Sequence, residues 1–129
     1  MEFKDYLKIL AFKDGSDLYL STGSQPRAKF NGVLKLLERD PLPSGRVKEI
    51  AYSIMSPTQA REFEERLEMN LAVSEPGVGR FRVNIFRQRN EISMVVRNIK
   101  TAIPNLSELG LPPVMTDIIM EKRGLILMV

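Results

Sequence analysis

The feature that most constrains the fold is the stretch MNLAVSEPGVGRFRVNIFRQRNEISMVVRNIK, which runs from residue 69 to residue 100. Much of it alternates apolar and polar residues, which is typical of strands that bury one face. Turn residues interrupt it at 76–79 and near Asn90, so we expect three consecutive strands. Because short turns join neighbouring strands only in antiparallel order, this half of the chain predicts an antiparallel sheet.

The second of these strands is unusual because residues 79–89, GRFRVNIFRQR, contain four arginines. Side chains alternate between the two faces of a strand, so Arg80 and Arg82 share one face, while the apolar residues from Phe81 onward pack the core from the other. A turn back into the third strand would bring Arg97 near this pair. The three arginines are therefore candidate binding residues.

The N-terminal part predicts a helix followed by a further piece of sheet. Apolar residues recur at helical spacing over residues 2–13, and residues 16–21, SDLYLS, alternate as a short strand. Asn31-Gly32 lies between two strand-like runs within 27–37, which is a strong hairpin signal. Ser16 and Asp17 are interpreted as a cap or turn rather than as a polar site.

Two more helices are expected between the two halves of the sheet. Apolar residues on a spacing of three and four predict a helix over 47–55, and Ser56 followed by Pro57 resembles an N-cap that opens a helix over 57–68. The sequence therefore predicts an α+β fold, mainly an antiparallel sheet with about three helices packed on it. Three aromatic side chains are assigned to its core: Phe63, Phe81 and Phe86.

The last 29 residues differ from the rest of the chain in residue composition and pattern. Prolines punctuate residues 101–122, which we interpret as a linker with a connecting helix, and the chain ends in GLILMV. An unbroken apolar run is typical of a strand buried on both faces of a parallel sheet, which nothing earlier in the chain provides. We therefore expect residues 1–100 to form one domain and residues 123–129 to begin a second, truncated one. The alternative is that residues 125–129 form an edge strand or an ordered tail of the first domain.

Composition excludes several classes of chemistry. The chain has 129 residues, 43% of them hydrophobic, which suits a single domain with a real core. It contains neither cysteine nor histidine, which excludes disulfides, cysteine nucleophiles, Ser-His-Asp triads and zinc sites with these ligands. A net charge of +3 names no partner by itself. The charged N-terminus has no signal-peptide pattern, so a cytoplasmic location is expected.

Several motifs occur in an order that resembles one known family. The chain contains GSDLYLSTGSQP, then a hairpin with NG, then GVGRFRVNIFRQRN, VVRNI, IPNLSELGLPPV and KRGLILMV. This series is similar to the N-terminal segment of the type IV pilus retraction ATPases of twitching motility, the PilT/PilU-like family. Tyr19 in SDLYLS stands where PilT-type motors usually carry histidine, so the resemblance is closer to the PilU-like members.

The resemblance implies a PAS-like N-terminal domain joined by the linker TAIPNLSEL to a RecA-like ATPase domain in a homohexameric ring. It implies that the full-length protein is an ATPase using ATP and Mg²⁺, with this domain in a regulatory and assembly role. The implied partners are ATPase domains of the same and neighbouring subunits, a PilT-like paralogue and an inner-membrane pilus platform protein; neither nucleic acid binding nor membrane insertion is expected. The implied location is cytoplasmic and peripheral at the inner membrane.

The chain itself is expected to be inactive. A phosphate-binding loop needs a Gly-Lys dipeptide, and the sequence contains none. No cofactor, catalytic residue or metal ligand is therefore expected within residues 1–129. In the related ring ATPases, arginines of the N-terminal domain contact nucleotide phosphates, and the resemblance assigns this role to Arg82 and Arg97, with Arg80 and Arg123 as further candidates.

Three other interpretations of the basic strands remain open. The arginines could form a solvated face that pairs with local carboxylates. Residues 80–100 could bind single-stranded nucleic acid, because Phe81 and Phe86 interleave with the basic residues. A PAS-type domain could also sense a small ligand, although no histidine or cysteine is present to hold haem or flavin.

Overall fold

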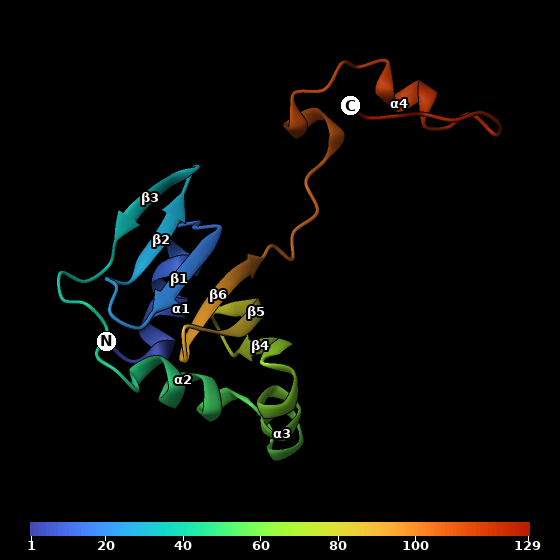
Figure 1. Cartoon of the computed structure of the whole chain (residues 1–129). Coiled ribbons are helices and arrows are strands. Elements are labelled where there is room, and N and C mark those ends of the chain that lie inside the picture. The colour runs from blue at the N-terminus through green and yellow to red at the C-terminus, as the bar shows by residue number, and fades with distance from the viewer.

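Six strands form one antiparallel sheet in the computed structural model, which describes all of residues 1–129 (Figure 1). The strand order is β3-β2-β1-β6-β5-β4, so the N-terminal strands continue the sheet built by residues 68–99. The strands are β1 (Asp17–Ser21), β2 (Arg27–Phe30), β3 (Val33–Leu36), β4 (Glu68–Glu75), β5 (Gly79–Gln88) and β6 (Glu91–Ile99). The predicted antiparallel sheet is confirmed.

Two tight hairpins set the register of this sheet. Asn31 and Gly32 join β2 to β3 with φ values of 48° and 79°, and Arg89 and Asn90 join β5 to β6 with φ values of 49° and 64°. Positive φ at both central residues defines the turn type whose twist matches that of paired strands. The hairpin predicted at Asn31-Gly32 and the turn predicted near Asn90 are therefore both confirmed.

Three helices cover one face of the sheet: α1 (Phe3–Phe12), α2 (Arg46–Ile54) and α3 (Pro57–Arg66). The capping signal ahead of α3 acts as predicted. The Gln59 backbone N–H donates to Ser56 Oγ at 3.2 Å, and the Ser56 N–H donates to Gln59 Oε1 at 2.9 Å. This reciprocal pair satisfies amide groups that the first turn of a helix leaves without partners.

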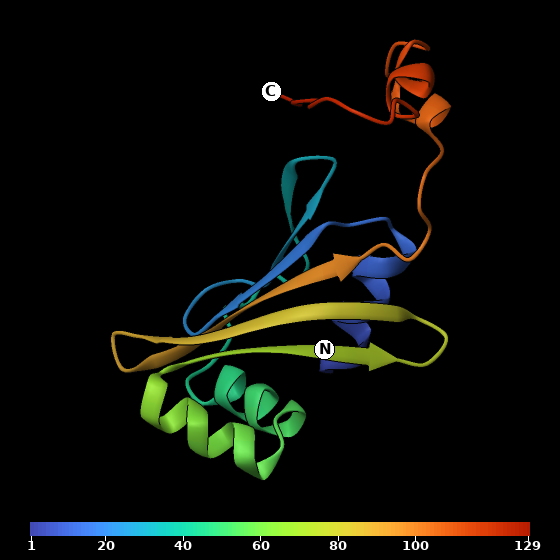
Figure 2. The ribbon, with the colours of Figure 1, turned by 90° about the vertical axis from the view of Figure 1, so that its right-hand side faces the viewer.

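The core lies between these helices and the sheet, as Figure 2 shows for α2 and α3. It contains 21 buried hydrophobic residues, drawn from α1, α2, α3 and the strands. Phe81, Val83 and Ile85 are fully buried, so alternate residues of β5 face the helices as expected. The neighbouring Arg80 and Arg82 are exposed on the opposite face. We call that opposite face the helix-free face.

Gly15 fixes the tight connection between α1 and β1. Its N–H donates to the Leu10 carbonyl at 2.7 Å, and a Cβ at this position would lie 2.7 Å from Leu10 Cδ1 and 2.9 Å from Phe30 Cε1. These distances are shorter than van der Waals contact, so a larger residue would require the Leu10 and Phe30 side chains to shift. Glycine therefore suits this short connection.

The residues after β6 leave the sheet and extend away from it (Figures 1 and 2). They contain a 3₁₀ helix at Leu106–Leu109 and the short helix α4 (Met115–Ile118), and none of residues 100–129 is buried. Helical turns were predicted in this region. None of the helices is long and apolar enough to cross a membrane.

The prediction of a strand near the C-terminus is not confirmed. Residues 124–129 are in neither a helix nor a strand. The alternative expectation was an edge strand or an ordered tail of the first domain, and the edge strand does not form because these residues pair with none of the six strands. A strand needs a neighbour for its backbone hydrogen bonds, and the chain offers this segment none.

Candidate functional site

The helix-free face carries a row of charged residues across four neighbouring strands. The register places Asp17 opposite both Lys29 on β2 and Arg97 on β6, and it places Arg97 opposite Arg82 on β5. Directly opposite residues of an antiparallel pair have Cβ atoms about 4.5–5.5 Å apart, so the side chains of this row are neighbours. The predicted proximity of Arg82 and Arg97 is therefore confirmed.

Only one of these two arginines has a carboxylate partner. Arg97 Nε donates to Asp17 Oδ1 at 3.0 Å, whereas Arg82 takes part in no ion pair of the structure. Like charges placed directly opposite each other in a sheet are destabilising. Asp17 offsets the repulsion between the two guanidinium groups, but the site keeps an excess of positive charge. Such a pair of arginines is suited to an anionic ligand.

A shallow depression of about 410 Å³ lies at the arginine pair. Two asparagines on its floor are hydrogen-bonded across the strands: Asn84 Nδ2 donates to Asn70 Oδ1 at 3.1 Å and to Glu68 Oε1 at 3.2 Å. The lining residues are Asn70, Arg82, Asn84, Val95 and Arg97. The depression therefore combines two guanidinium groups with carboxamides, a donor-rich lining that suits phosphate oxygens.

A second depression, of about 290 Å³, lies near the β2–β3 hairpin. It is lined by Tyr19, Ser21, Ser24, Gln25, Arg27 and Leu34. It contains a single charged residue, Arg27, so it lacks the convergence of two cations found at Arg82 and Arg97. We therefore regard the arginine pair as the candidate site.

The structure separates the other basic candidates. Arg80 lies on the helix-free face, opposite Ile99 and next along β5 from Arg82. Arg87 belongs to the opposite face, because it is an odd number of positions from Arg82, and Arg89 lies in the β5–β6 turn. Arg123 is exposed in the C-terminal segment and is not brought to the pair. The basic run therefore contributes Arg80 and Arg82, but not all its arginines, to one face.

Sequence reasoning missed Asp17, which was interpreted as part of a cap or turn. Asp17 instead begins β1, is buried, and bonds to Arg97 across 80 positions of sequence. One signal was available, because the alternation of SDLYLS places Asp17 and Tyr19 on the face opposite the buried Leu18 and Leu20. Nothing in the sequence pattern showed which residue it would meet.

The assignment of Phe86 to the core was wrong. Phe63 and Phe81 are buried as expected, but Phe86 is only half-buried and lies opposite Ser93 of β6, on the same face as Arg82. Phe86 is an even number of positions from Arg82, so it cannot point toward the helices without a break in the strand. The alternation of β5 therefore overrides the apolar character of this residue.

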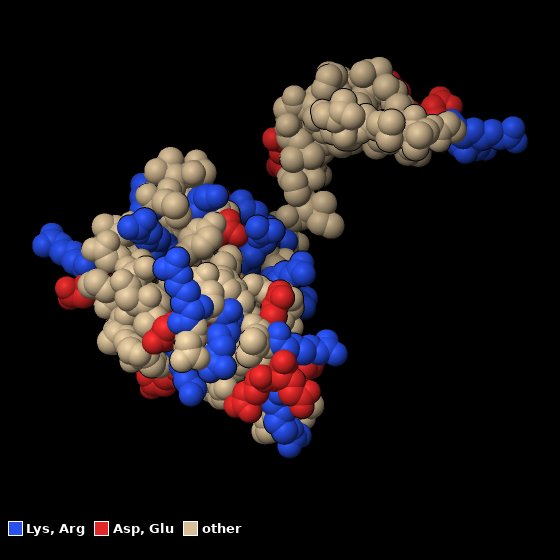
Figure 3. All heavy atoms as spheres, in the orientation of Figure 1, with Lys and Arg blue, Asp and Glu red and all other residues tan.

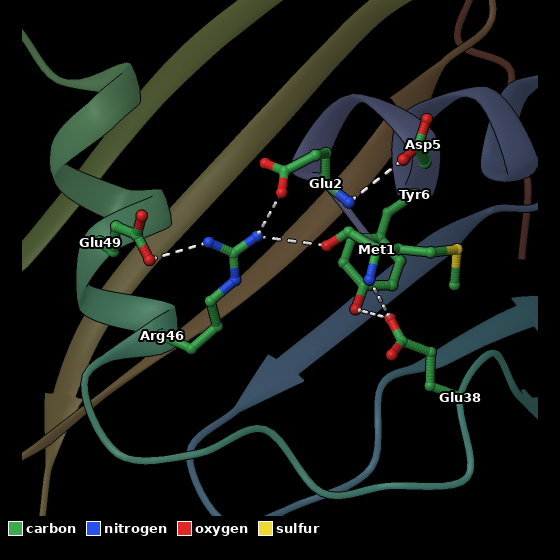
Figure 4. Close-up of polar contacts among 7 residues, drawn as sticks. All are labelled: Met1, Glu2, Asp5, Tyr6, Glu38, Arg46 and Glu49. Carbon is green, nitrogen blue, oxygen red and sulfur yellow. Dashed lines mark hydrogen bonds and ion pairs between the residues drawn. The ribbon is translucent and has the colours of Figure 1, made fainter.

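A second polar cluster ties the N-terminal helix to the rest of the domain (Figure 4). Tyr6 donates a hydrogen bond to Glu38, which also accepts from the Met1 ammonium group at 3.1 Å. Arg46 donates to Glu49 at 2.8 Å and to Glu2 at 3.3 Å, which joins α2 to the start of α1. The cluster is a structural clamp between elements and lies apart from the arginine pair.

Titration of this clamp affects stability. Burial, with the hydrogen bond to Glu38, raises the pKa of Tyr6 well above its usual range. The hydrogen bond from Tyr6 lowers the pKa of Glu38 below its ordinary value of 4.5. A carboxyl whose pKa is lower in the folded state contributes stability above its unfolded pKa, and that stability is lost as the pH falls through the folded pKa.

We expect Tyr6→Phe to reduce the free energy of unfolding by about 1–2 kcal/mol at neutral pH, because it removes a hydrogen bond to a charged group. The difference from the wild type should shrink below the Glu38 pKa, where the carboxyl is protonated in both chains. Urea denaturation at a series of pH values from neutral into the acid range measures this. Tyr52→Phe, which removes a hydroxyl bonded to Glu64, is the matched control. A difference that is equal at every pH value would contradict the assignment.

Surface charge differs between the domain and the C-terminal segment (Figure 3). Basic and acidic side chains are interspersed over the visible part of the domain, whereas the C-terminal segment is mostly uncharged, with a few acidic side chains along it and basic ones at its far end. Several apolar side chains of the C-terminal segment are exposed: Ile103, Leu109, Val114, Ile119, Met120 and Leu125 to Val129.

The described chain contains no group of three acidic side chains placed to hold a metal ion.

Comparison with known proteins finds relatives among the type IV pilus ATPases. The type IV pilus ATPase PilU of Pseudomonas aeruginosa is 41% identical over 129 residues, which is the whole chain and 34% of that protein. The type IV pilus retraction ATPase PilT of the same organism is 35% identical over 98% of the chain and 37% of its own length. A crystal structure of the pilus retraction motor PilT with bound ADP has a TM-score of 0.76 and 29% sequence identity to the chain. The match covers 91% of this chain and 34% of the PilT chain. No protein-family model matches the chain.

The chain fits an N-terminal segment of a PilT/PilU-like type IV pilus ATPase and is more similar to PilU than to PilT. It spans about a third of the length of these relatives. The resemblance expected from the motifs is therefore confirmed, and the α+β architecture matches that of the PilT structure.

Proposed function

We propose that the chain is the N-terminal regulatory and assembly domain of a hexameric motor ATPase that powers type IV pilus retraction and twitching motility. In this proposal, Arg82 and Arg97 contact the nucleotide phosphates when the ATPase domain closes against the helix-free face. The observation that carries the proposal is the placement of two opposed, exposed arginines, one of which lacks a carboxylate partner.

The chemistry of arginine supports this role. A guanidinium group stays charged at every physiological pH and offers a planar fork that matches two phosphate oxygens. During phosphoryl transfer, negative charge is redistributed over the γ-phosphate oxygens, and arginines placed there stabilise it. Because Arg97 is engaged through Nε, its two terminal nitrogens are available for such contacts.

Two further arginines belong to the proposal with less direct support. Arg80 lies next to Arg82 on the same face and would extend the contact surface. Arg123 is exposed in the segment that follows β6, so we propose that it reaches the nucleotide as a second domain assembles around that segment. The structure does not bring Arg123 to a phosphate position.

The remaining parts of the proposal concern the longer protein. We propose a PAS-like domain at residues 1–100, a linker with a connecting helix at 101–122, and the first strand of a RecA-like domain at 123–129. ATP and Mg²⁺ bind in the ATPase domain, and acidic residues outside this chain hold the metal. The proposed partners are neighbouring subunits, a PilT-like paralogue and an inner-membrane platform protein, with the assembly in the cytoplasm at the inner membrane.

The two alternative functions are less well supported. Nucleic acid binding needs aromatic side chains that stack on bases, and Phe81 is fully buried while Phe86 is half-buried. A PAS-type sensor needs a cavity between the helices and the sheet, and 21 buried side chains pack that region. Neither alternative gains a specific observation in its favour.

A comparison of the chain with the longer protein tests the proposal. Residues 1–129 alone should show no ATP hydrolysis above the buffer blank, because the chain lacks a phosphate-binding loop. The longer protein should hydrolyse ATP, and the activity should depend on Arg82. A measured ATPase activity of residues 1–129 that Arg82→Ala abolishes would contradict the proposal, because it would place catalysis within this chain.

A further inference from the structure

We infer that Asp17 is the positioning residue of the phosphate site and that it orients Arg97 toward a polyphosphate group. This inference rests on the proposed function and deepens it, because it assigns a role to Asp17, the buried carboxylate in the row of charged residues on the helix-free face. Asp17 contacts neither the ligand nor the reacting atoms. It acts through Arg97, which it holds at Nε with an N–O distance of 3.0 Å.

The position of Asp17 is set by the start of β1. The Asn98 backbone N–H donates to the Ser16 carbonyl at 2.9 Å, and Asn98 Nδ2 donates to the Gly15 carbonyl at 3.1 Å. These two bonds tie the residues before Asp17 to the residue after Arg97. A Cβ at Gly15 would lie 2.7 Å from Leu10 Cδ1 and 2.9 Å from Phe30 Cε1, so glycine allows the close packing of α1 at this point. Asp17 and Arg97 are therefore held opposite each other by the backbone.

The exposure of the two side chains is markedly unequal. The Asp17 side chain is 10% exposed, whereas the Arg97 side chain is 70% exposed. The pair of Lys100 and Asp14 exposes both partners, at 65% and 73%, whereas Lys4 and Glu75 are also unequal, at 69% and 18%. A buried carboxylate that grips an exposed guanidinium through Nε restricts rotation of the group while its two terminal nitrogens stay in solvent. This arrangement presents the fork of the guanidinium outward.

The charges around Asp17 leave the site positive. Lys29 lies opposite Asp17 on one side and Arg97 on the other, with Arg82 beyond Arg97. Within this row one carboxylate stands among three cations, and the Glu68 carboxylate on the same face is bonded to Asn84. Asp17 reduces the repulsion between the two arginines without neutralising the face, so the face still attracts an anion with several negative charges. A triphosphate chain has this chemistry.

A positioning role and a merely electrostatic role of Asp17 predict opposite effects of its removal on the affinity for an anion. If Asp17 only reduced the positive charge of the face, its removal would strengthen the binding of an anion. If Asp17 orients Arg97, loss of the acceptor frees the guanidinium and weakens binding, because the ordering of the side chain must then occur during binding. Asp17→Asn keeps an acceptor oxygen without the charge, whereas Asp17→Ala removes both.

Side-chain NMR of residues 1–129 with inorganic tripolyphosphate distinguishes the positioning role of Asp17 from the electrostatic one. We expect the Arg97 Nε–H signal of the wild type to be protected from solvent exchange, and tripolyphosphate to shift the signals of Arg82 and Arg97. Asp17→Ala should lose the protection and bind tripolyphosphate about tenfold more weakly. Asp17→Asn should bind as well as the wild type or better. Asp14→Asn is the matched control. It removes an equal charge three positions before Asp17, and Asp14 pairs with Lys100 rather than with Arg97.

The outcomes separate this inference from the proposed function. Tighter binding by Asp17→Ala than by the wild type, similar to the effect of Asp14→Asn, would overturn the positioning role while leaving the phosphate contact intact. An unprotected Arg97 Nε–H in the wild type would overturn it as well. The absence of any tripolyphosphate shift at Arg82 and Arg97 would overturn the proposed phosphate contact, and the positioning role with it.

Discussion

Arg82→Ala in the longer protein that includes the ATPase domain is expected to lower kcat for ATP hydrolysis by about 10²- to 10⁴-fold. The reason is that a guanidinium placed at the transferred phosphoryl group stabilises transition-state charge in a site that excludes water. Arg97→Ala should have an effect of the same order. Arg82→Lys should recover only part of the activity, because lysine keeps the charge but lacks the planar fork. Steady-state ATPase kinetics measure all three variants.

Arg87→Ala is the matched control for this prediction. Arg87 lies on the same strand and is exposed, but it belongs to the other face of the sheet. Its removal should change kcat by less than about twofold, since surface substitutions away from a site have small effects. Full activity of Arg82→Ala, or an equal loss in Arg87→Ala, would show that the helix-free face has no part in catalysis.

The second large effect is expected at Phe81, on the opposite side of the same strand. Phe81 is fully buried on a central strand, so Phe81→Ala leaves a cavity in the core and should reduce the free energy of unfolding by about 3–5 kcal/mol. Urea denaturation followed by circular dichroism measures this quantity.

Phe12→Ala provides the comparison for this prediction. Phe12 ends α1 and is 70% exposed, so the same change of side chain there should cost less than about 1 kcal/mol. Similar losses for Phe12→Ala and Phe81→Ala would contradict the assignment of the two faces of β5, because the arginines are exposed only if Phe81 faces the helices.

The elements that local patterns determine were predictable. Asn31-Gly32 adopts the positive φ values that a tight hairpin needs, and Ser56 with Gln59 forms a reciprocal cap. Strand alternation also placed Arg82 and Arg97 on one face, because a short turn fixes which residues of two strands are opposite. These predictions needed only the residues within each element and its turn.

Features that depend on distant parts of the chain were not predictable from the residues alone. Asp17 meets Arg97 only because β1 pairs with β6, a pairing between strands that are not consecutive in the sequence. The clamp that joins Tyr6, Glu38 and Arg46 also connects three separate segments. Phe86 was misassigned because hydrophobicity was weighed without its register on β5.

The two faces of β5 and β6 explain how one sheet serves two purposes. The face that packs against the helices contains Phe81, Val83, Met94 and Val96, which supply the apolar burial that holds the fold together. The helix-free face is then available for charged residues that would be costly in the core. In the proposed function, Arg82 and Arg97 on this face meet the nucleotide phosphates.

The most direct measurement of the central claim is an experimental structure of the longer protein with a non-hydrolysable ATP analogue and Mg²⁺. We predict that terminal guanidinium nitrogens of Arg82 and Arg97 lie within about 3.2 Å of phosphate oxygens, while Arg97 Nε remains bonded to Asp17. Phosphates contacted solely by residues of the ATPase domain, with the helix-free face left in solvent, would contradict this prediction.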